Sequence, residues 1–155
     1  MFDMMYEEIE IKDINAEVFE KFIMEEIEPY LSISLSKKLT VPSLHDFCLK
    51  TIDLADGYVF VSKGIIIGVA TAYIRNRYTN NVYLNMLGVA RFYRKKGIGT
   101  RLLLKIINDL PEGCNLVTNV DAENKEAFKF YRKMGFISKK IDKGRMTIEY
   151  KNPNT

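Results

Sequence analysis

Apolar residues recur along the chain partly at the spacing of helices and partly at that of strands. Phe19, Phe22 and Ile23 lie on one stripe of a helix, whereas residues 65–74 are largely apolar on both faces, as in a central strand. Segment 30–41 fits neither pattern. In chain order the patterns predict a strand, two helices, three strands, a helix, a strand, a helix and two strands, with bounds near 6–11, 16–28, 42–56, 58–62, 65–74, 82–89, 98–109, 115–120, 125–134, 136–140 and 145–150.

Residues 83–104 combine a strand, a basic turn with two glycines and the start of a helix. Gly97 and Gly99 separate the apolar run 84–89 from a helix with a continuous apolar face. A helix N-terminus offers an anion its unpaired backbone N–H groups and the positive end of the helix dipole, and glycines let the anion approach the backbone. The basic residues gather between 91 and 101, where no acidic residue occurs. We interpret this stretch as a diphosphate-binding site.

The spacing of the glycines shows which of the known diphosphate-binding motifs this stretch matches. A dinucleotide-binding fingerprint would need a third glycine where Leu102 stands, and the phosphate-binding loop G-x-x-x-x-G-K-[ST] does not occur in the chain. Residues 94–99, RKKGIG, match instead the pattern [RQ]-x-x-G-x-[GA], with Leu87-x-Val89 just upstream. This combination resembles the coenzyme A motif of the GNAT superfamily of N-acetyltransferases.

A second block, NKEAFKFYRKMGF at residues 124–136, strengthens the resemblance. Asn124 is placed to cap a helix that Gly135 would end. The pattern N-x-x-A-x-x-F-Y-x-x-x-G-F, and its distance from the first block, are similar to the second conserved block of that family. The resemblance implies an α/β (α+β) fold with a mixed, mostly antiparallel sheet of about seven strands and about four helices on both faces. We expect a single domain over residues 1–150 and a loose tail at 151–155.

The resemblance also implies where acetyl-CoA would bind as co-substrate. Its pantetheine arm would lie between splayed strands at 82–89 and 115–120 and hydrogen-bond to their backbone, with the thioester carbonyl facing an N–H near Leu87. Tyr131 would donate to the departing thiolate. Taken alone it would be an ordinary half-buried aromatic of an amphipathic helix, but the surrounding block favours the catalytic role. The implied cofactor-binding residues are Leu87, Val89, Arg94, Lys95, Lys96, Gly97, Ile98, Gly99, Thr100 and Asn124, and no metal is expected.

The sequence does not identify a base for the proton of the attacking amine. Some relatives place a glutamate five residues before the asparagine of the second block, where this chain has Asn119. Asn119 cannot accept a proton, although it could hold a water as part of the catalytic site. Asp121 fits a turn better, and His45 fits a surface position. Our hypothesis is that a water chain or bulk solvent removes the proton.

The sequence gives the weakest indication of which residues bind the acceptor amine. Tyr30, Tyr73, Tyr78, Tyr83 and Asn85 could line an acceptor pocket, and equally the tyrosines could be ordinary strand residues. This region is not conspicuously acidic, which disfavours a polyamine. An amino sugar, an amino acid and a protein N-terminus remain open. The alternative function is a non-catalytic sensor that holds an acyl-CoA, and the missing glutamate at position 119 supports it.

Composition and charge bear on nucleic-acid binding, zinc binding and the cellular compartment. The net charge of +3 over 155 residues is too weak to argue for nucleic acid. A single histidine and two cysteines outside any metal-binding spacing disfavour zinc and suit a reducing compartment. The N-terminus lacks a signal-peptide pattern and no apolar run reaches the length of a membrane span. We expect a soluble cytoplasmic protein, and a homodimer paired through the C-terminal hairpin is compatible with the sequence.

Overall fold

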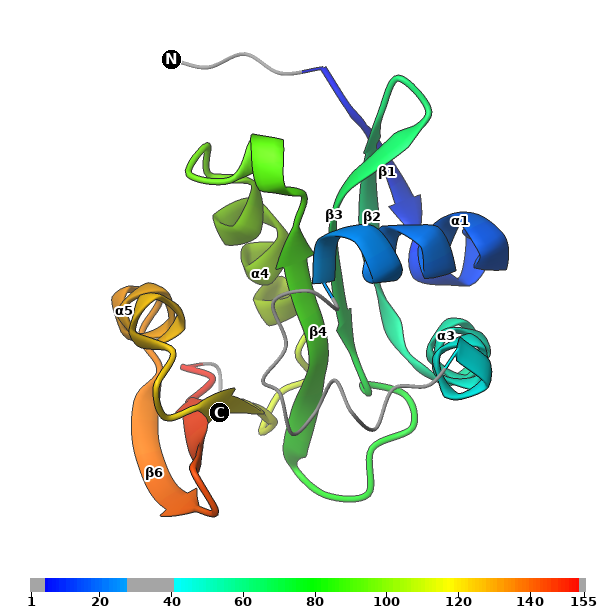
Figure 1. Cartoon of the computed structure of the whole chain (residues 1–155). Coiled ribbons are helices and arrows are strands. Elements are labelled where there is room, and N and C mark those ends of the chain that lie inside the picture. Colours follow the sequence, from blue (N-terminus) through cyan, green and yellow to red (C-terminus); the bar gives the residue numbers. More distant parts are fainter. Residues whose placement is uncertain (1–4, 28–40, 154–155) are drawn as a thin grey trace.

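The described residues, 5–27 and 41–153 of a computed structural model, form one seven-stranded sheet (Figure 1). All neighbouring strands are antiparallel except β4 and β5, which are parallel. This confirms the predicted mixed, mostly antiparallel sheet. From one edge to the other, the strands are β1 (Glu7–Glu10), β2 (Asp56–Ser62), β3 (Ile65–Ala72), β4 (Asn81–Val89), β5 (Asn115–Asp121), β7 (Arg145–Tyr150) and β6 (Ile137–Asp142).

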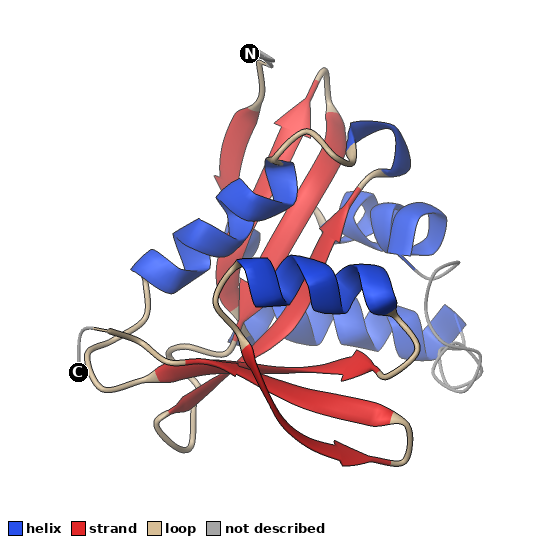
Figure 2. Ribbon diagram, turned by 90° about the vertical axis from the view of Figure 1, so that its left-hand side faces the viewer, coloured by secondary structure: helices blue, strands red, loops and turns tan. Residues whose placement is uncertain are grey.

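The helices cover both faces of the sheet, as predicted. On one face lie α1 (Ala16–Phe22), the π-helix η2 (Ile23–Ile27) and α3 (Val41–Leu54). On the other lie α4 (Ile98–Asn108) and α5 (Lys125–Lys133), which stand in front of the strands in Figure 2. Each face has its own buried cluster, one around α4 and one around α1 and α3. None of these helices, within the described residues, combines the length and the apolar character needed to cross a membrane.

The parallel strands β4 and β5 pair over only a short distance and then part. Their register runs from Asn81 opposite Asn115 to Tyr83 opposite Val117. Beyond that point the hydroxyl of Thr118 donates to the backbone carbonyl of Leu84 over 3.0 Å. β4 remains paired with β3, and β5 remains paired with β7. The predicted splay between the two strands is therefore present in the structure.

The structure differs from the sequence prediction at several element ends. The first strand stops at Glu10, because Ile11 begins a 3₁₀ turn and is buried there. The helix that begins at Ala16, capped by Asn15 as predicted, changes to a π-helix at Ile23. Apolar spacing does not distinguish these two helix types over so short a segment.

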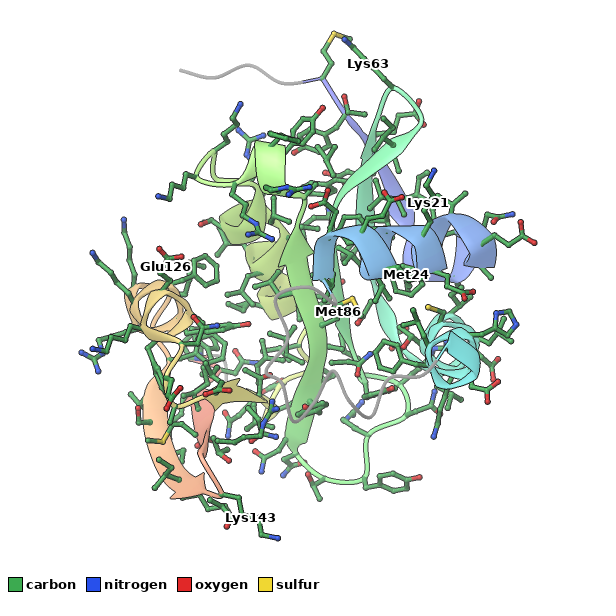
Figure 3. The ribbon with its side chains drawn as sticks, viewed as in Figure 1. Lys21, Met24, Lys63, Met86, Glu126 and Lys143 are labelled. Carbon is green, nitrogen blue, oxygen red and sulfur yellow. The ribbon has the colours of Figure 1, made fainter. Side chains whose placement is uncertain are left out.

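The strand predicted at 65–74 ends at Ala72, and the one predicted from Phe136 begins at Ile137. The tail expected to be loose from residue 151 is held at Asn152. This side chain is buried, its backbone N–H donates to the Asn115 side chain over 3.1 Å, and its Nδ2 donates to a carbonyl at 3.2 Å. Both hairpin tips have a positive-φ lysine, Lys63 and Lys143, and they lie at opposite ends of the molecule (Figure 3).

Candidate functional site

The glycine turn before α4 leads into the N-terminus of this helix, where Gly97 is the N-cap. After the short 3₁₀ turn η4 (Arg91–Tyr93), Lys95 and Gly97 take positive φ values of 61° and 83°. No side chain caps this helix end. The first N–H of α4 that bonds back to the turn is that of Arg101, which donates to the Gly97 carbonyl over 3.0 Å. The N–H groups at 98–100 therefore have no partner within the helix, as expected for an anion site.

The same turn is braced against the end of η2. A carboxylate oxygen of Glu26 accepts from the backbone N–H of Arg91 over 2.8 Å. Arg94 donates through Nε to the carbonyl of Val89 over 3.0 Å, and through its terminal nitrogen to the Glu26 carbonyl over 3.4 Å. Arg94 was predicted to bind the cofactor, and its side chain is here engaged with backbone carbonyls. Glu26 had no sequence signal, because its partner is 65 residues away.

A groove of about 810 Å³, which we call the glycine groove, runs from this turn to α5. It is lined by β4, the turn, the first residues of α4 and one face of α5. Among the described residues, the predicted cofactor-binding positions Leu87, Val89, Arg94, Lys95, Gly97, Ile98, Gly99, Thr100 and Asn124 line it, whereas Lys96 does not.

Helix α5 places Tyr131 in the wall of the glycine groove. As predicted, Asn124 caps this helix, its side-chain oxygen accepting from the backbone N–H of Ala127 over 3.1 Å. The Tyr131 ring packs edge-on against Phe136, with centroids 5.0 Å apart. Burial, and to a lesser degree the nearby Tyr83, raise the pKa of Tyr131. Within the part of the chain that the structure describes, its hydroxyl makes no hydrogen bond, so it remains a donor for a ligand.

A second hollow of about 660 Å³, the side pocket, opens on the other side of the parted strands. Ile27, Leu87, Asp121, Asn124, Ala127 and Tyr131 line both hollows. The two hollows therefore meet where β4 and β5 separate, next to the Tyr131 side chain. One wall of the side pocket is apolar, and Met86 points from β4 into this region toward α1 and α3 (Figure 3). The described residues of that wall are Ile23, Ile27, Leu44, Phe47 and Met86.

The predicted acceptor residues separate into two groups. Tyr83 and Asn85 line the side pocket. Asn85 is fixed by its Nδ2, which lies 3.2 Å from the Thr51 hydroxyl and 3.3 Å from that of Thr71. Tyr73 is not among the described lining residues. Burial raises the pKa of its hydroxyl, and the nearby Thr51 partly offsets this effect. Tyr78 is fully exposed and is not a lining residue. Tyr30 lies outside the described residues.

The candidate proton acceptors have distinct surroundings. Asn119 lines the side pocket, and its Oδ1 accepts from the Thr147 hydroxyl over 2.9 Å. Asp121 forms the predicted turn, because its carboxylate accepts from the backbone N–H of Glu123 over 3.0 Å. His45 is on the surface as predicted, 2.9 Å from a carboxylate oxygen of Glu20. No group of three or more metal-ligating side chains occurs within residues 5–27 and 41–153.

Comparison with known proteins agrees with this geometry. The model of the acetyltransferase (GNAT) family matches residues 20–136. The chain belongs to the GNAT family. N-alpha-acetyltransferase 30 of Xenopus laevis is 43% identical over 60 residues, which cover 37% of this chain and 22% of that protein. Streptothricin acetyltransferase A of Bacillus subtilis is 36% identical over 81 residues, covering 51% of this chain and 44% of that protein. The matches thus span less than half of either relative.

Solved GNAT structures share the fold along nearly the whole chain. The PaiA N-acetyltransferase of Thermoplasma acidophilum, in complex with coenzyme A, has a TM-score of 0.72 at 19% identity and covers 96% of this chain and 99% of that one. The ribosomal-protein-S18-alanine N-acetyltransferase of Escherichia coli has a TM-score of 0.72 at 14% identity, covering 94% and 93%. At these identities the likeness establishes the GNAT fold alone.

Proposed function

We propose that this GNAT protein transfers an acetyl group from acetyl-CoA to a primary amine, with both substrates bound at the same time. One observation carries the proposal: the glycine groove and the side pocket meet at Tyr131, where β4 and β5 part. A thioester laid along the glycine groove would reach this junction from one side. An amine in the side pocket would reach it from the other, so no covalent enzyme intermediate is needed.

The reaction balances within this arrangement. The amine nitrogen attacks the thioester carbonyl carbon, an N–C bond forms, the C–S bond breaks, and the sulfur leaves as a thiolate while the amine loses one proton. The N–H groups at 98–100 would hold the diphosphate of the cofactor. The pantetheine arm would hydrogen-bond to β4 near Leu87 and Val89, where β5 no longer pairs with it. An N–H near Leu87 would stabilise the developing oxyanion.

Tyr131 serves in this proposal as a hydrogen-bond donor to the departing sulfur. A thiol has a pKa of about 8.5 and a free tyrosine about 10, so proton transfer from tyrosine to thiolate is uphill. Burial raises the pKa of Tyr131 further, which makes complete transfer still less favourable. The amine proton goes to water, since Asn119 in the side pocket has no basic group and its Oδ1 is hydrogen-bonded to Thr147.

The acceptor class is open between a small amine and a protein N-terminus. The names of the relatives include both kinds, an N-alpha-acetyltransferase and a streptothricin acetyltransferase. The second candidate function is a non-catalytic acyl-CoA sensor, favoured by Asn119 in place of a carboxylate. Cys48 and Cys114 are both unpaired and buried, which suits a reducing compartment and supports a cytoplasmic site of action.

Two measurements test the proposal. Acetyl-CoA should raise the thermal unfolding midpoint by mass action. A panel of amino acids, amino sugars and short peptides should then release free thiol from acetyl-CoA in the presence of the protein. Binding without thiol release on the whole panel would favour the sensor. The absence of any midpoint shift with acetyl-CoA would contradict both functions.

A further inference from the structure

We infer that the acceptor amine carries a carboxylate, as an amino acid does, and that Arg145 binds this carboxylate. The inference rests on the proposed function and specifies its acceptor. Arg145 starts β7 and lines the side pocket. Among the described residues that line this pocket, Arg145 is the one with a positively charged side chain. The sequence motifs for acetyl-CoA gave no reason to expect a cation in this pocket.

The guanidinium of Arg145 has donors to spare. One terminal nitrogen donates to the backbone carbonyl of Asn119 over 3.3 Å. None of the ion pairs between described residues includes Arg145, although Asp121 and Asp142 are its direct neighbours in the strand register. A guanidinium has five N–H donors in a planar fork that matches a carboxylate in a two-point contact. A half-buried arginine that lines a pocket and forms no ion pair with a described carboxylate therefore suits an anionic substrate group.

The part of the pocket next to Arg145 suits an amine, since Asp121 is its direct partner in the register of β5 and β7. Asp121 lies at the junction of the two hollows, and one of its carboxylate oxygens accepts from Glu123. Asn85 also lines the pocket, where its Nδ2 donates to two threonines and its Oδ1 is a hydrogen-bond acceptor. Asn119, to which Arg145 is bonded, precedes Asp121 by two residues, about 7 Å along a strand. An amine at the junction and an anion at Arg145 are thus only a few bonds apart in one acceptor.

The apolar wall of the side pocket suits the side chain of such an amino acid. Leu44, Phe47 and Met86 face the pocket from α3 and β4. An amino acid with an apolar side chain would place its amine at the junction, its carboxylate at Arg145 and its side chain against this wall. A polyamine would instead bring a second cation toward Arg145, which is unfavourable.

The test compares acceptors that differ only in charge. Leucine, methionine and phenylalanine are each compared with the corresponding amino-acid amide and with a dipeptide that begins with the same residue. We expect kcat/KM to be about 10- to 100-fold higher for the free acids than for the amides, as for a hydrogen-bonded charge pair. Arg145→Gln should remove most of this preference through KM, leave kcat/KM for the amides within about threefold, and leave the midpoint shift by acetyl-CoA unchanged.

The matched control is Arg132→Gln, on the exposed side of α5, which should alter neither class of acceptor. Equal use of acids and amides by the wild type, preference for the dipeptides, or an equal loss for acids and amides in Arg145→Gln would overturn the inference while leaving the acetyl transfer intact. The midpoint shift that acids and amides add to the CoA-bound protein gives a second readout. If no amine releases thiol, the proposed function fails, and this binding preference still decides the role of Arg145.

Discussion

Replacing Gly97 by alanine tests whether the glycine turn holds a diphosphate. Gly97 has φ +83°, and a Cβ added to it would meet no atom within 4 Å. The direct cost is therefore backbone strain, about 1 kcal/mol for alanine in the left-handed region. For a protein of this size we expect the unfolding midpoint to fall by about 2–4 °C.

Gly113 offers a matched control outside both hollows. Its φ is +80°, and a Cβ there would also meet no atom within 4 Å. Gly113→Ala should therefore lower the midpoint of the free protein by about as much as Gly97→Ala. The two variants should differ only in their response to acetyl-CoA, because Gly97 lines the glycine groove and Gly113 does not.

The expected difference follows from mass action. If relaxation of the strained turn misaligns one N–H bonded to the diphosphate, the loss is about 1.5–3 kcal/mol, or a 10- to 100-fold weaker Kd. At 100 times the wild-type Kd, acetyl-CoA stabilises the wild type by about 2.7 kcal/mol, and a protein with tenfold weaker binding by about 1.4 kcal/mol. Thermal unfolding with and without acetyl-CoA resolves this gap. An equal ligand-induced shift in both glycine variants would refute the assignment of the turn as the diphosphate site.

Three further substitutions test the other parts of the site. Tyr131→Phe should keep acetyl-CoA binding and lower kcat about 10- to 100-fold, the worth of a hydrogen bond to a charged sulfur, as measured by thiol release. Gly88→Ala would place a Cβ 2.1 Å from Cδ1 of Ile27, the end of a side chain that can rotate, so we expect a loss of about 0.5–1.5 kcal/mol in chemical denaturation and a changed acceptor KM. His45→Ala should leave the pH profile of kcat unchanged and reduce stability only at low pH, since the hydrogen bond to Glu20 raises the pKa of His45.

Each of these three has its own control. Tyr150→Phe also removes a hydroxyl from a ring packed against Phe136, but outside both hollows, so kcat should not change. Compared with the Ile27→Ala single variant, adding Gly88→Ala should change the stability very little. A persistent loss of stability would show that another clash is responsible. The His45 contribution should be complete below pH about 6.5, its unfolded-state pKa, and disappear as the pH rises through the folded-state pKa. Loss of the acidic limb of the kcat profile, where activity falls as a base becomes protonated, would instead make His45 the base.

Local sequence signals were enough for most of the fold and for the glycine groove. The Gly97 turn and the Asn124 cap depend on residues adjacent in sequence, and the GNAT resemblance supplied the splay of the strands. The features that escaped prediction join distant segments. Glu26 reaches Arg91 across 65 residues, and Asn85 reaches Thr51 across 34. Such contacts are set by how the two layers of helices settle on the sheet, for which spacing along the chain has no signature.

The short pairing of β4 with β5 also bears on how the molecule responds to its ligands. Three residue pairs form the backbone ladder that joins four strands on one side to three on the other, while the buried cluster around α4 is shared by both sides, so the ladder itself should open at a lower free energy than the whole domain unfolds. A thioester that contacts both the Gly97 turn and the α5 helix would bridge the ladder. Amide hydrogen exchange in β5 and β7 should then slow when acetyl-CoA binds. An acceptor that binds afterwards would bind more tightly, because acetyl-CoA has already ordered the site.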